Sequence, residues 1–170
     1  EKKNLTLITE KAENDNLFDL LQKVENSESS DDYDNTARQI ILIGIARALM
    51  LLHKNKFIHG DLRPENICLD KSLHPLISGF YLPKVTGSKK NQFSGYPIYF
   101  PPEAIDNNQF DEKSDVYSFG ILMNQIITSK RPYVELFKKP LTVFKFIQKV
   151  IDGARPKITN SIKPSLKSII

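Results

Sequence analysis

The longest apolar run in the chain, at residues 40–52, reads IILIGIARALMLL and most constrains the fold. A helix that spans a membrane needs about 20 apolar residues. This run is shorter, and Arg47 interrupts it. We therefore interpret it as part of a buried helix over roughly residues 36–55, and we predict no membrane span. The chain of 170 residues is long enough to form one domain with a core around such a helix.

Three other segments have the apolar spacing of helices. They are NLFDLLQKV at residues 16–24, SDVYSFGILMNQIITS at 114–129 and LTVFKFIQKVIDG at 141–153. Ser114 or Asp115 is the predicted N-cap of the second of these helices. The pattern therefore predicts a mainly α chain with a few short strands. A short helix is expected at 101–105, and strands are expected at 5–12, at 74–84 and on both sides of residues 59–66.

Composition favours an intracellular protein. Net charge is +4, and the basic residues are interleaved with acidic ones, so we expect no nucleic-acid partner. The single Cys excludes an internal disulfide, which favours a reducing compartment, and we expect a cytoplasmic location. The chain opens without Met or a signal peptide and closes on PSLKSII, so we expect both ends to be cut from a longer protein.

A dense polar segment, FIHGDLRPENICLD, occupies residues 57–70. It places one His, two Asp, one Arg, one Glu and one Asn between two apolar runs, just before a strand-like segment. Such a loop either carries a site or is a solvated turn whose side chains bond their own backbone. The residues alone leave both interpretations open.

Five segments in order resemble the protein kinase family. HGDLRPEN at 59–66 resembles the kinase catalytic loop H-R-D-L-x-x-x-N. GYPIYFPPEA at 95–104 resembles G-T-P-x-Y-x-A-P-E at the end of the activation segment, and DEKSDVYSFGILMNQIITSKRPY at 111–133 resembles the helix that follows it. GARP at 153–156 matches the late Arg motif, and LITEKAENDNLFDLL at 7–21 resembles the hinge and the next helix. The resemblance covers nearly the whole chain.

The resemblance implies an α+β fold by fragment, mainly α: a protein-kinase-like fold with a hinge and a helical C-lobe. Residues 1–15 would be the last N-lobe strand and the hinge, and residues 16–170 the C-lobe, truncated before its final helices. Nothing resembles the Gly-rich loop or the Val-Ala-Ile-Lys strand, so the N-lobe is expected to be missing from this chain. The DLRPEN and DVYSFGILMNQIIT segments are most similar to Ser/Thr kinases of the tyrosine-kinase-like group.

The resemblance also assigns catalytic roles to the polar loop. Asp61 falls where kinases keep the carboxylate that orients the substrate hydroxyl and accepts its proton. Arg63 falls where Ser/Thr kinases usually carry a Lys that faces the transferred phosphoryl group, so the positive charge is retained. Asn66 matches the residue that binds a metal ion. His59 matches a packed, structural His.

The resemblance implies further binding and bracing roles. Thr9 would be the gatekeeper, the backbone of Glu10 and Ala12 would meet the adenine, and Cys68 would lie under its ring, so ATP is an expected ligand. Asp115 would hold the backbone of the catalytic loop. Glu103 and Arg155 match an ion pair that braces the lower lobe.

The sequence departs from the family at the Asp-Phe-Gly triplet. The best fit places it at Gly79-Phe80-Tyr81, so the carboxylate that holds Mg²⁺ is absent. Shifting the alignment by one residue would place Ser78 there, which is also a poor Mg²⁺ ligand. No acidic residue lies between positions 70 and 103 to replace it. We therefore expect Mg²⁺ binding to be weak or absent.

Two further departures concern regulation. Gly60 replaces the Arg that would pair with a phosphorylated activation loop, and Tyr96 replaces the Thr that links this loop to the catalytic Asp. Switching by phosphorylation of Thr86, Ser88 or Ser94 is therefore not expected.

Three functions remain open from the sequence. The first is a pseudokinase that binds partner proteins, and ATP as well, in signalling. The second is an active ATP-dependent serine/threonine kinase with protein substrates. The third is a non-functional fragment.

Overall fold

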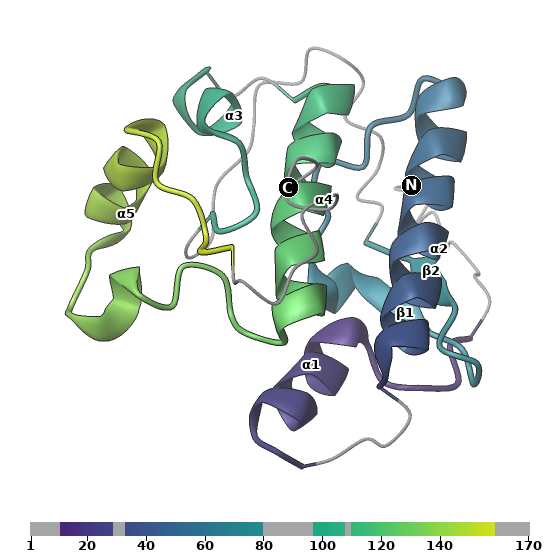
Figure 1. Ribbon diagram of the computed structural model, residues 1–170. Helices are drawn as coiled ribbons and strands as arrows, with labels where there is room; N and C mark the ends of the chain where they lie inside the picture. The colour runs from purple at the N-terminus through teal and green to yellow at the C-terminus, as the bar shows by residue number, and fades with distance from the viewer. Residues whose placement is uncertain (1–10, 29–32, 80–96, 108–109, 159–170) are drawn as a thin grey trace, which may run out of the picture.

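The structure is a computed structural model, and it describes residues 11–28, 33–79, 97–107 and 110–158. This part of the chain is mainly helical, as the sequence predicts, with one short pair of strands (Figure 1). The strand expected just before residues 59–66 is not formed, because the chain passes from the end of α2 through a turn directly into the polar loop. In chain order the elements are α1 (Leu17–Glu25), α2 (Asn35–Lys54), the 3₁₀ turn η1 (Pro64–Asn66), β1 (Ile67–Leu69), β2 (Pro75–Ile77), α3 (Pro102–Asn107), α4 (Glu112–Thr128), the 3₁₀ turn η2 (Leu136–Lys138) and α5 (Val143–Ile151).

Helix α2 begins after Asp34, whose carboxylate accepts the backbone N–H of Ala37 at 2.8 Å. By length and composition α2 could cross a membrane, with a mean hydropathy of 1.3 in its most apolar window. In this structure, one apolar face of the helix packs in the core beside α4 and β2. That face is built from buried residues spaced four apart: Ala37, Ile41, Ile45 and Leu49.

Helix α4 begins two residues earlier than the sequence pattern suggests. Its N-cap is Asp111, whose carboxylate accepts the backbone N–H of Ser114 at 2.9 Å. The hydroxyl of Ser114 accepts the backbone N–H of Asp111 at 3.1 Å in return, which completes a capping box. The prediction that Ser114 or Asp115 is the N-cap was therefore wrong.

The strands form one antiparallel pair in which Cys68 is opposite Leu76. The turn between them is closed by Asp70, whose carboxylate accepts the backbone N–H groups of Ser72 and His74, each at 2.8 Å. The strand expected at 74–84 is observed only at Pro75–Ile77, and its later part from residue 80 lies outside the described residues. The strand expected at 5–12 lies mostly outside them too.

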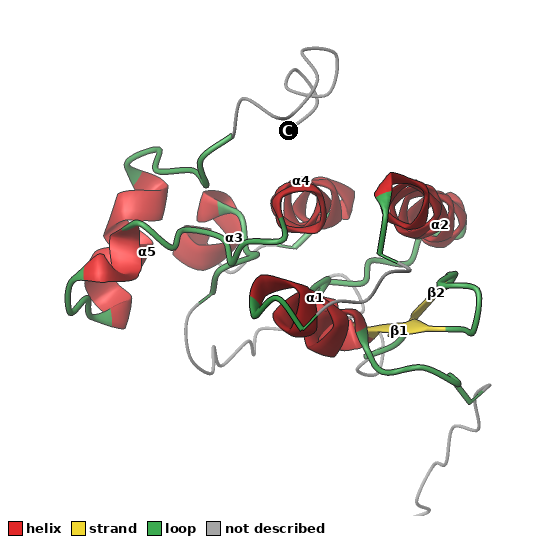
Figure 2. Ribbon diagram, turned by 60° about the horizontal axis from the view of Figure 1, so that its bottom comes forward, coloured by secondary structure: helices red, strands yellow, loops and turns green. Residues whose placement is uncertain are grey.

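Two clusters of buried side chains hold the elements together. The first joins α1, α2, β1 and the C-terminal half of α4. The second joins α4, α5 and the segments around Ile98 and Tyr133. Figure 2 shows α2 and α4 side by side, with α1 and the strands below them and α5 at the far end. This arrangement places the loop between α2 and β1 against the N-terminal end of α4.

Candidate active site

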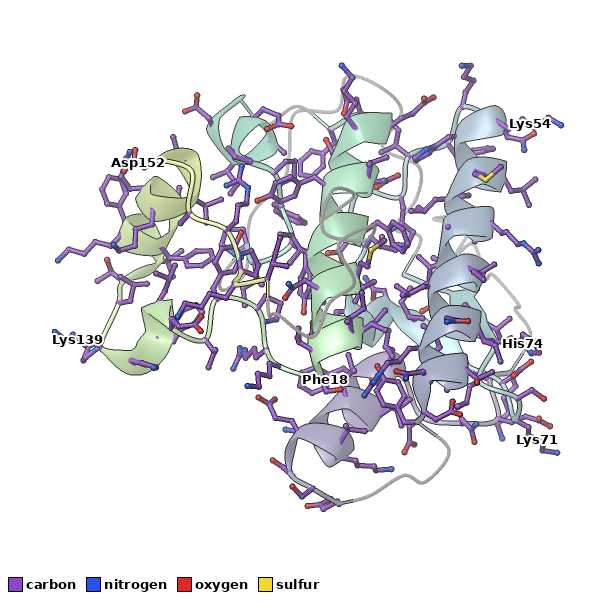
Figure 3. All side chains as sticks on the ribbon, viewed as in Figure 1. Phe18, Lys54, Lys71, His74, Lys139 and Asp152 are labelled. Atoms are coloured by element: carbon purple, nitrogen blue, oxygen red, sulfur yellow. The ribbon has the colours of Figure 1, made fainter. Side chains whose placement is uncertain are left out.

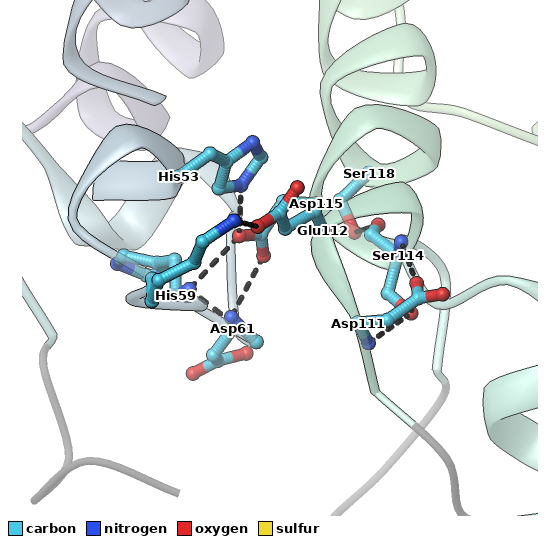
Figure 4. Close-up of polar contacts among 10 residues, drawn as sticks. His53, His59, Asp61, Asp111, Glu112, Ser114, Asp115 and Ser118 are labelled. Carbon is cyan, nitrogen blue, oxygen red and sulfur yellow. Dashed lines mark hydrogen bonds and ion pairs between the residues drawn. The ribbon is translucent and has the colours of Figure 1, made fainter. Parts of the chain in front are cut away.

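One buried carboxylate on α4 holds the backbone of the polar loop at 59–66. Asp115 accepts the backbone N–H of His59 at 2.9 Å and that of Gly60 at 2.8 Å, and Nε2 of His53 donates to it at 2.9 Å (Figure 4). Burying a carboxylate is costly unless donors replace its water, and three donors do so here. The predicted contact between Asp115 and the loop backbone is confirmed.

His59 connects the loop to the end of β2. Its Nδ1 accepts the backbone N–H of Asp61 at 3.2 Å, so the ring proton lies on Nε2. That Nε2 then donates to the carbonyl of Ser78 at 2.8 Å. His59 is buried, so its predicted packed, structural role is confirmed.

The three residues with predicted catalytic roles lie together. Nδ2 of Asn66 donates to the backbone carbonyl of Asp61 at 2.7 Å and to its carboxylate at 3.0 Å. Nε of Arg63 lies 3.7 Å from the carboxylate of Asp61 and 3.9 Å from that of Glu65. A carboxylate, an amide and a guanidinium therefore face one small region. The loop also bonds its own backbone, because the Asn66 amide reaches the carbonyl of Asp61 as well as its carboxylate.

Gly79 approaches the Asn66 side chain so closely that a Cβ at residue 79 would force the Asn66 amide to shift. Its φ is +78°, and a Cβ at this position would lie 2.5 Å from Cγ and 2.6 Å from Oδ1 of Asn66. Real Cβ atoms essentially never come this close to another atom. The missing side chain at residue 79 and the position of the Asn66 amide are therefore coupled.

These side chains do not fit a kinase-type Mg²⁺ site. Mg²⁺ requires near-octahedral oxygen ligands and usually one or two carboxylates. Asp61 offers the carboxylate, but it already accepts from Asn66, and Gly79 offers none. Within the described ranges, no group of three or more His, Cys, Asp and Glu side chains could hold a metal ion.

The predicted nucleotide-binding residues are placed only in part. Thr9 and Glu10 lie outside the described residues, whereas Ala12 and Cys68 are both half-buried. The segment after Ala12 runs beside β1, because the N–H of Asn14 donates to the carbonyl of Leu69 at 3.1 Å. Phe80, Tyr81, Thr86, Ser88, Ser94 and Tyr96 also lie outside the described residues.

Sequence reasoning missed a contact that ties the segment at 97–101 to α4. The hydroxyl of Tyr99 donates to Oε1 of Gln125 at 2.6 Å, and the hydroxyl of Ser118 donates to the carbonyl of Tyr99 at 2.8 Å. Burial, and then the nearby Glu65 carboxylate, raises the pKa of Tyr99 above its usual value. The sequence signal for this contact was Tyr99, the second Tyr of the GYPIYFPPEA motif. His53 was also missed, because its role depends on the approach of two helices.

The predicted ion pair between Glu103 and Arg155 was wrong. Within the described residues these two side chains form no ion pair. Arg155 instead donates to the carbonyls of Val150 and Ala154, at 3.1 and 2.8 Å, and its guanidinium lies 5.2 Å from the ring centroid of Tyr117. The carbonyls of Val150 and Ala154, at and just after the end of α5, are closer acceptors for the cation than the carboxylate on α3.

The polar loop that carries Asp, Arg and Asn is held by a buried Asp from the next long helix, the arrangement that the resemblance to protein kinases predicts for the catalytic loop. A family model described as "Protein kinase domain" matches residues 1–170. The chain therefore belongs to the protein kinase family.

Similar curated proteins agree with this assignment. A "probable receptor-like serine/threonine-protein kinase" of Arabidopsis thaliana is 33% identical over 82% of this chain and 26% of its own length. A leucine-rich repeat receptor-like serine/threonine/tyrosine-protein kinase of the same plant is 31% identical over 94% of this chain and 26% of its own length. An Aurora kinase of Patiria pectinifera is 30% identical over 84% of this chain and 37% of its own length. The chain thus spans between 26% and 37% of the length of these relatives.

Proposed function

We propose that this protein is a pseudokinase, a kinase-like domain that binds partner proteins in signalling and transfers little or no phosphoryl group. The observation that carries the proposal is the contact between Gly79 and Asn66. Residue 79 has no carboxylate, and the Asn66 amide occupies the space that a side chain at residue 79 would enter. An intracellular, cytoplasmic location is part of the same proposal.

Without a metal ion, the site would lack positive charge that phosphoryl transfer needs. In phosphoryl transfer the protein mainly positions groups and neutralises charge on the phosphates. Stabilisation by a metal ion contributes several kcal/mol to such a transition state. Because about 1.4 kcal/mol corresponds to a factor of ten in rate, its loss costs roughly a thousandfold or more. Arg63 keeps a positive charge, but its Nε lies near two carboxylates that already partly balance it.

ATP binding remains part of the proposal. Cys68 and the segment after Ala12 lie side by side, and the resemblance to kinases assigns both to the adenine site. We expect ATP, if bound, to be held mainly through its base, with Mg²⁺ contributing weakly or not at all.

A second candidate is an active serine/threonine kinase with unusual metal use. It is favoured by the close approach of Asp61, Arg63 and Asn66, the side chains that would act on the substrate hydroxyl and the phosphoryl group. The third candidate, a fragment without function, predicts poor solubility and a broad thermal transition.

Transfer of labelled phosphate from ATP separates these candidates. The protein and its Asp61→Asn variant are assayed side by side, with Mg²⁺ and with EDTA. Equal background in both supports the pseudokinase, provided that thermal unfolding is cooperative. Transfer by the protein that disappears in Asp61→Asn would establish the active kinase and contradict the proposal. ATP-dependent stabilisation that survives EDTA would support nucleotide binding without a metal ion.

A further inference from the structure

Helix α5 has apolar residues on more of its surface than it buries. Phe146 and Val150 are buried in the second cluster. Phe144 and Ile151, seven residues apart and therefore on one face, have exposed fractions of 74% and 39%. A helix that is apolar over most of its circumference is usually buried. Figure 2 shows α5 at the edge of the molecule.

Unpaired lysines lie on and beside this outer face. Lys145 and Lys149 are exposed on α5, and Lys138 and Lys139 precede it; within the described residues, none of the four forms an ion pair. Figure 3 shows Lys139 and Asp152 at opposite ends of α5, on the outer edge. Residues 130–158 hold eight Lys and Arg against two Asp and Glu, an excess larger than the +4 of the whole chain.

The apolar and basic residues form two neighbouring strips. At 100° per residue, Gln148 lies between Phe144 on one side and Lys145 and Lys149 on the other. Its amide donates to the carboxylate of Asp152 at 2.9 Å. We call the surface formed by Phe144, Lys145, Lys149 and Ile151 the outer face of α5.

We propose that the outer face of α5 is a docking surface for an acidic segment of a partner protein, with aromatic or aliphatic side chains next to its Asp and Glu residues. Apolar side chains would cover Phe144 and Ile151 and supply most of the affinity. Carboxylates would face Lys145 and Lys149, favouring rapid and selective association. A purely apolar partner would leave the lysines without counter-charges, and a purely acidic one would leave Phe144 in water.

An anionic membrane fits this surface less well. A helix that lies on a bilayer buries its whole apolar face in the lipid, but Phe146 and Val150 on the larger apolar face of α5 are already packed inside the protein. The docking surface involves none of Asp61, Arg63 or Asn66, so it stands whether or not the site transfers phosphoryl groups.

The test begins with selection from a random peptide display library on the immobilised protein. We expect the selected peptides to be acidic with aromatic or aliphatic residues, and to bind more weakly as salt is raised. In fluorescence anisotropy, Phe144→Ala and the double variant Lys145→Glu, Lys149→Glu should each weaken binding about tenfold or more. The matched controls are on α2: Met50→Ala, at a residue 70% exposed, and Lys54→Glu should leave binding unchanged.

Four outcomes would overturn the proposal. Selected peptides could lack acidic residues, or could bind all variants equally. Vesicles of anionic lipid could bind the protein through Phe144 and the two lysines while no acidic peptide is selected. Sedimentation could show self-association that Phe144→Ala abolishes, which would assign this face to a second copy of the chain. Circular dichroism of each variant checks that the fold is unchanged.

Discussion

At the scale of single residues, the site depends on the close approach of the Asn66 side chain to the backbone of Gly79, thirteen positions later in the chain. Asn66 holds the carbonyl and the carboxylate of Asp61 through one amide nitrogen. It can lie there because Gly79 has no Cβ. The absence of a carboxylate at residue 79 and the present position of the Asn66 amide thus both depend on Gly79, and placing a carboxylate at 79 requires Asn66 to move.

Gly79→Ala tests this coupling. The new Cβ would overlap Asn66, and the positive φ adds strain, so we expect a loss of roughly 2–4 kcal/mol in the free energy of unfolding. The matched control is Gly153→Ala, where φ is +98° but no atom lies within 4 Å of the new Cβ. It should cost only the strain of the backbone, about 1–2 kcal/mol. Urea unfolding measures both.

A double variant separates overlap from strain. Combining Gly79→Ala with Asn66→Ala removes the overlapping amide. The double variant should therefore lose less free energy of unfolding than the two single variants together, by about 1 kcal/mol or more. Strict additivity would show that Asn66 does not occupy the space beside residue 79.

Asp115 gives a second prediction at this scale. Asp115→Asn keeps the shape but replaces an acceptor by an NH₂ group that faces the donors of His53, His59 or Gly60. Because these donors are buried, we expect a loss of about 3 kcal/mol or more in the free energy of unfolding. Asp106→Asn, at an exposed position on α3, is the control and should change stability by less than about 0.5 kcal/mol. Similar effects in both would mean that Asp115 does not fix the loop.

At the scale of elements, the apolar period of the sequence predicted the helices, but not the N-cap of α4 or the contacts between helices. The helix expected at 16–24 is observed at Leu17–Glu25, and Asn16 caps it by accepting the N–H of Asp19 at 3.0 Å. Such local signals act within one turn, so a sequence displays them. The ion pair expected for Arg155 failed because its partner depends on the distance between α3 and α5, which no local pattern encodes.

In the candidate active site too, the sequence predicted the residue types but not the contacts between distant residues. The types of Asp61, Arg63 and Asn66, and the missing carboxylate at 79, are visible in the sequence. The approach of Gly79 to Asn66 is not, because it depends on how the turn after β1 returns the chain past the loop. His53 escaped notice for the same reason, since its bond to Asp115 requires α2 and α4 to be antiparallel neighbours.

The two sides of α5 give a prediction about packing. Phe146 is fully buried, with its ring centroid 5.3 Å from that of Tyr133 and 5.5 Å from that of Phe137. Phe146→Ala should lower the free energy of unfolding by about 3–5 kcal/mol, through lost burial and a cavity. Phe144→Ala, two positions away and mostly exposed, should change it by less than about 0.5 kcal/mol. Equal losses in urea unfolding would mean that Phe144 is buried and that the outer face of α5 is not free.

At the scale of the whole molecule, the link between the segment before α2 and the end of α4 should make the protein sensitive to alkaline pH. Tyr33 is buried and its hydroxyl donates to the carbonyl of Ile126 at 2.8 Å. Burial raises its pKa to about 12, although the nearby Arg38 opposes the shift. The pKa of an unfolded Tyr is about 10. Burial also raises the pKa of Tyr133.

The sign of the effect follows from which state loses its proton first. Between about pH 10 and 12 the unfolded chain releases the Tyr33 proton and the folded protein keeps it, so rising pH favours unfolding. Below about pH 10 this stability is fully present, and two pKa units correspond to roughly 2–3 kcal/mol lost by pH 12.

Lysines titrate in the same range, so the measurement is the difference between the protein and Tyr33→Phe. The variant should be less stable at pH 7, because it lacks the hydrogen bond to Ile126, and should lose less stability from pH 9 to 11.5 in urea unfolding. Parallel pH profiles would mean that Tyr33 ionises as easily in the folded protein as in the unfolded chain, and that the contact joining α4 to the start of α2 opens before the rest of the core.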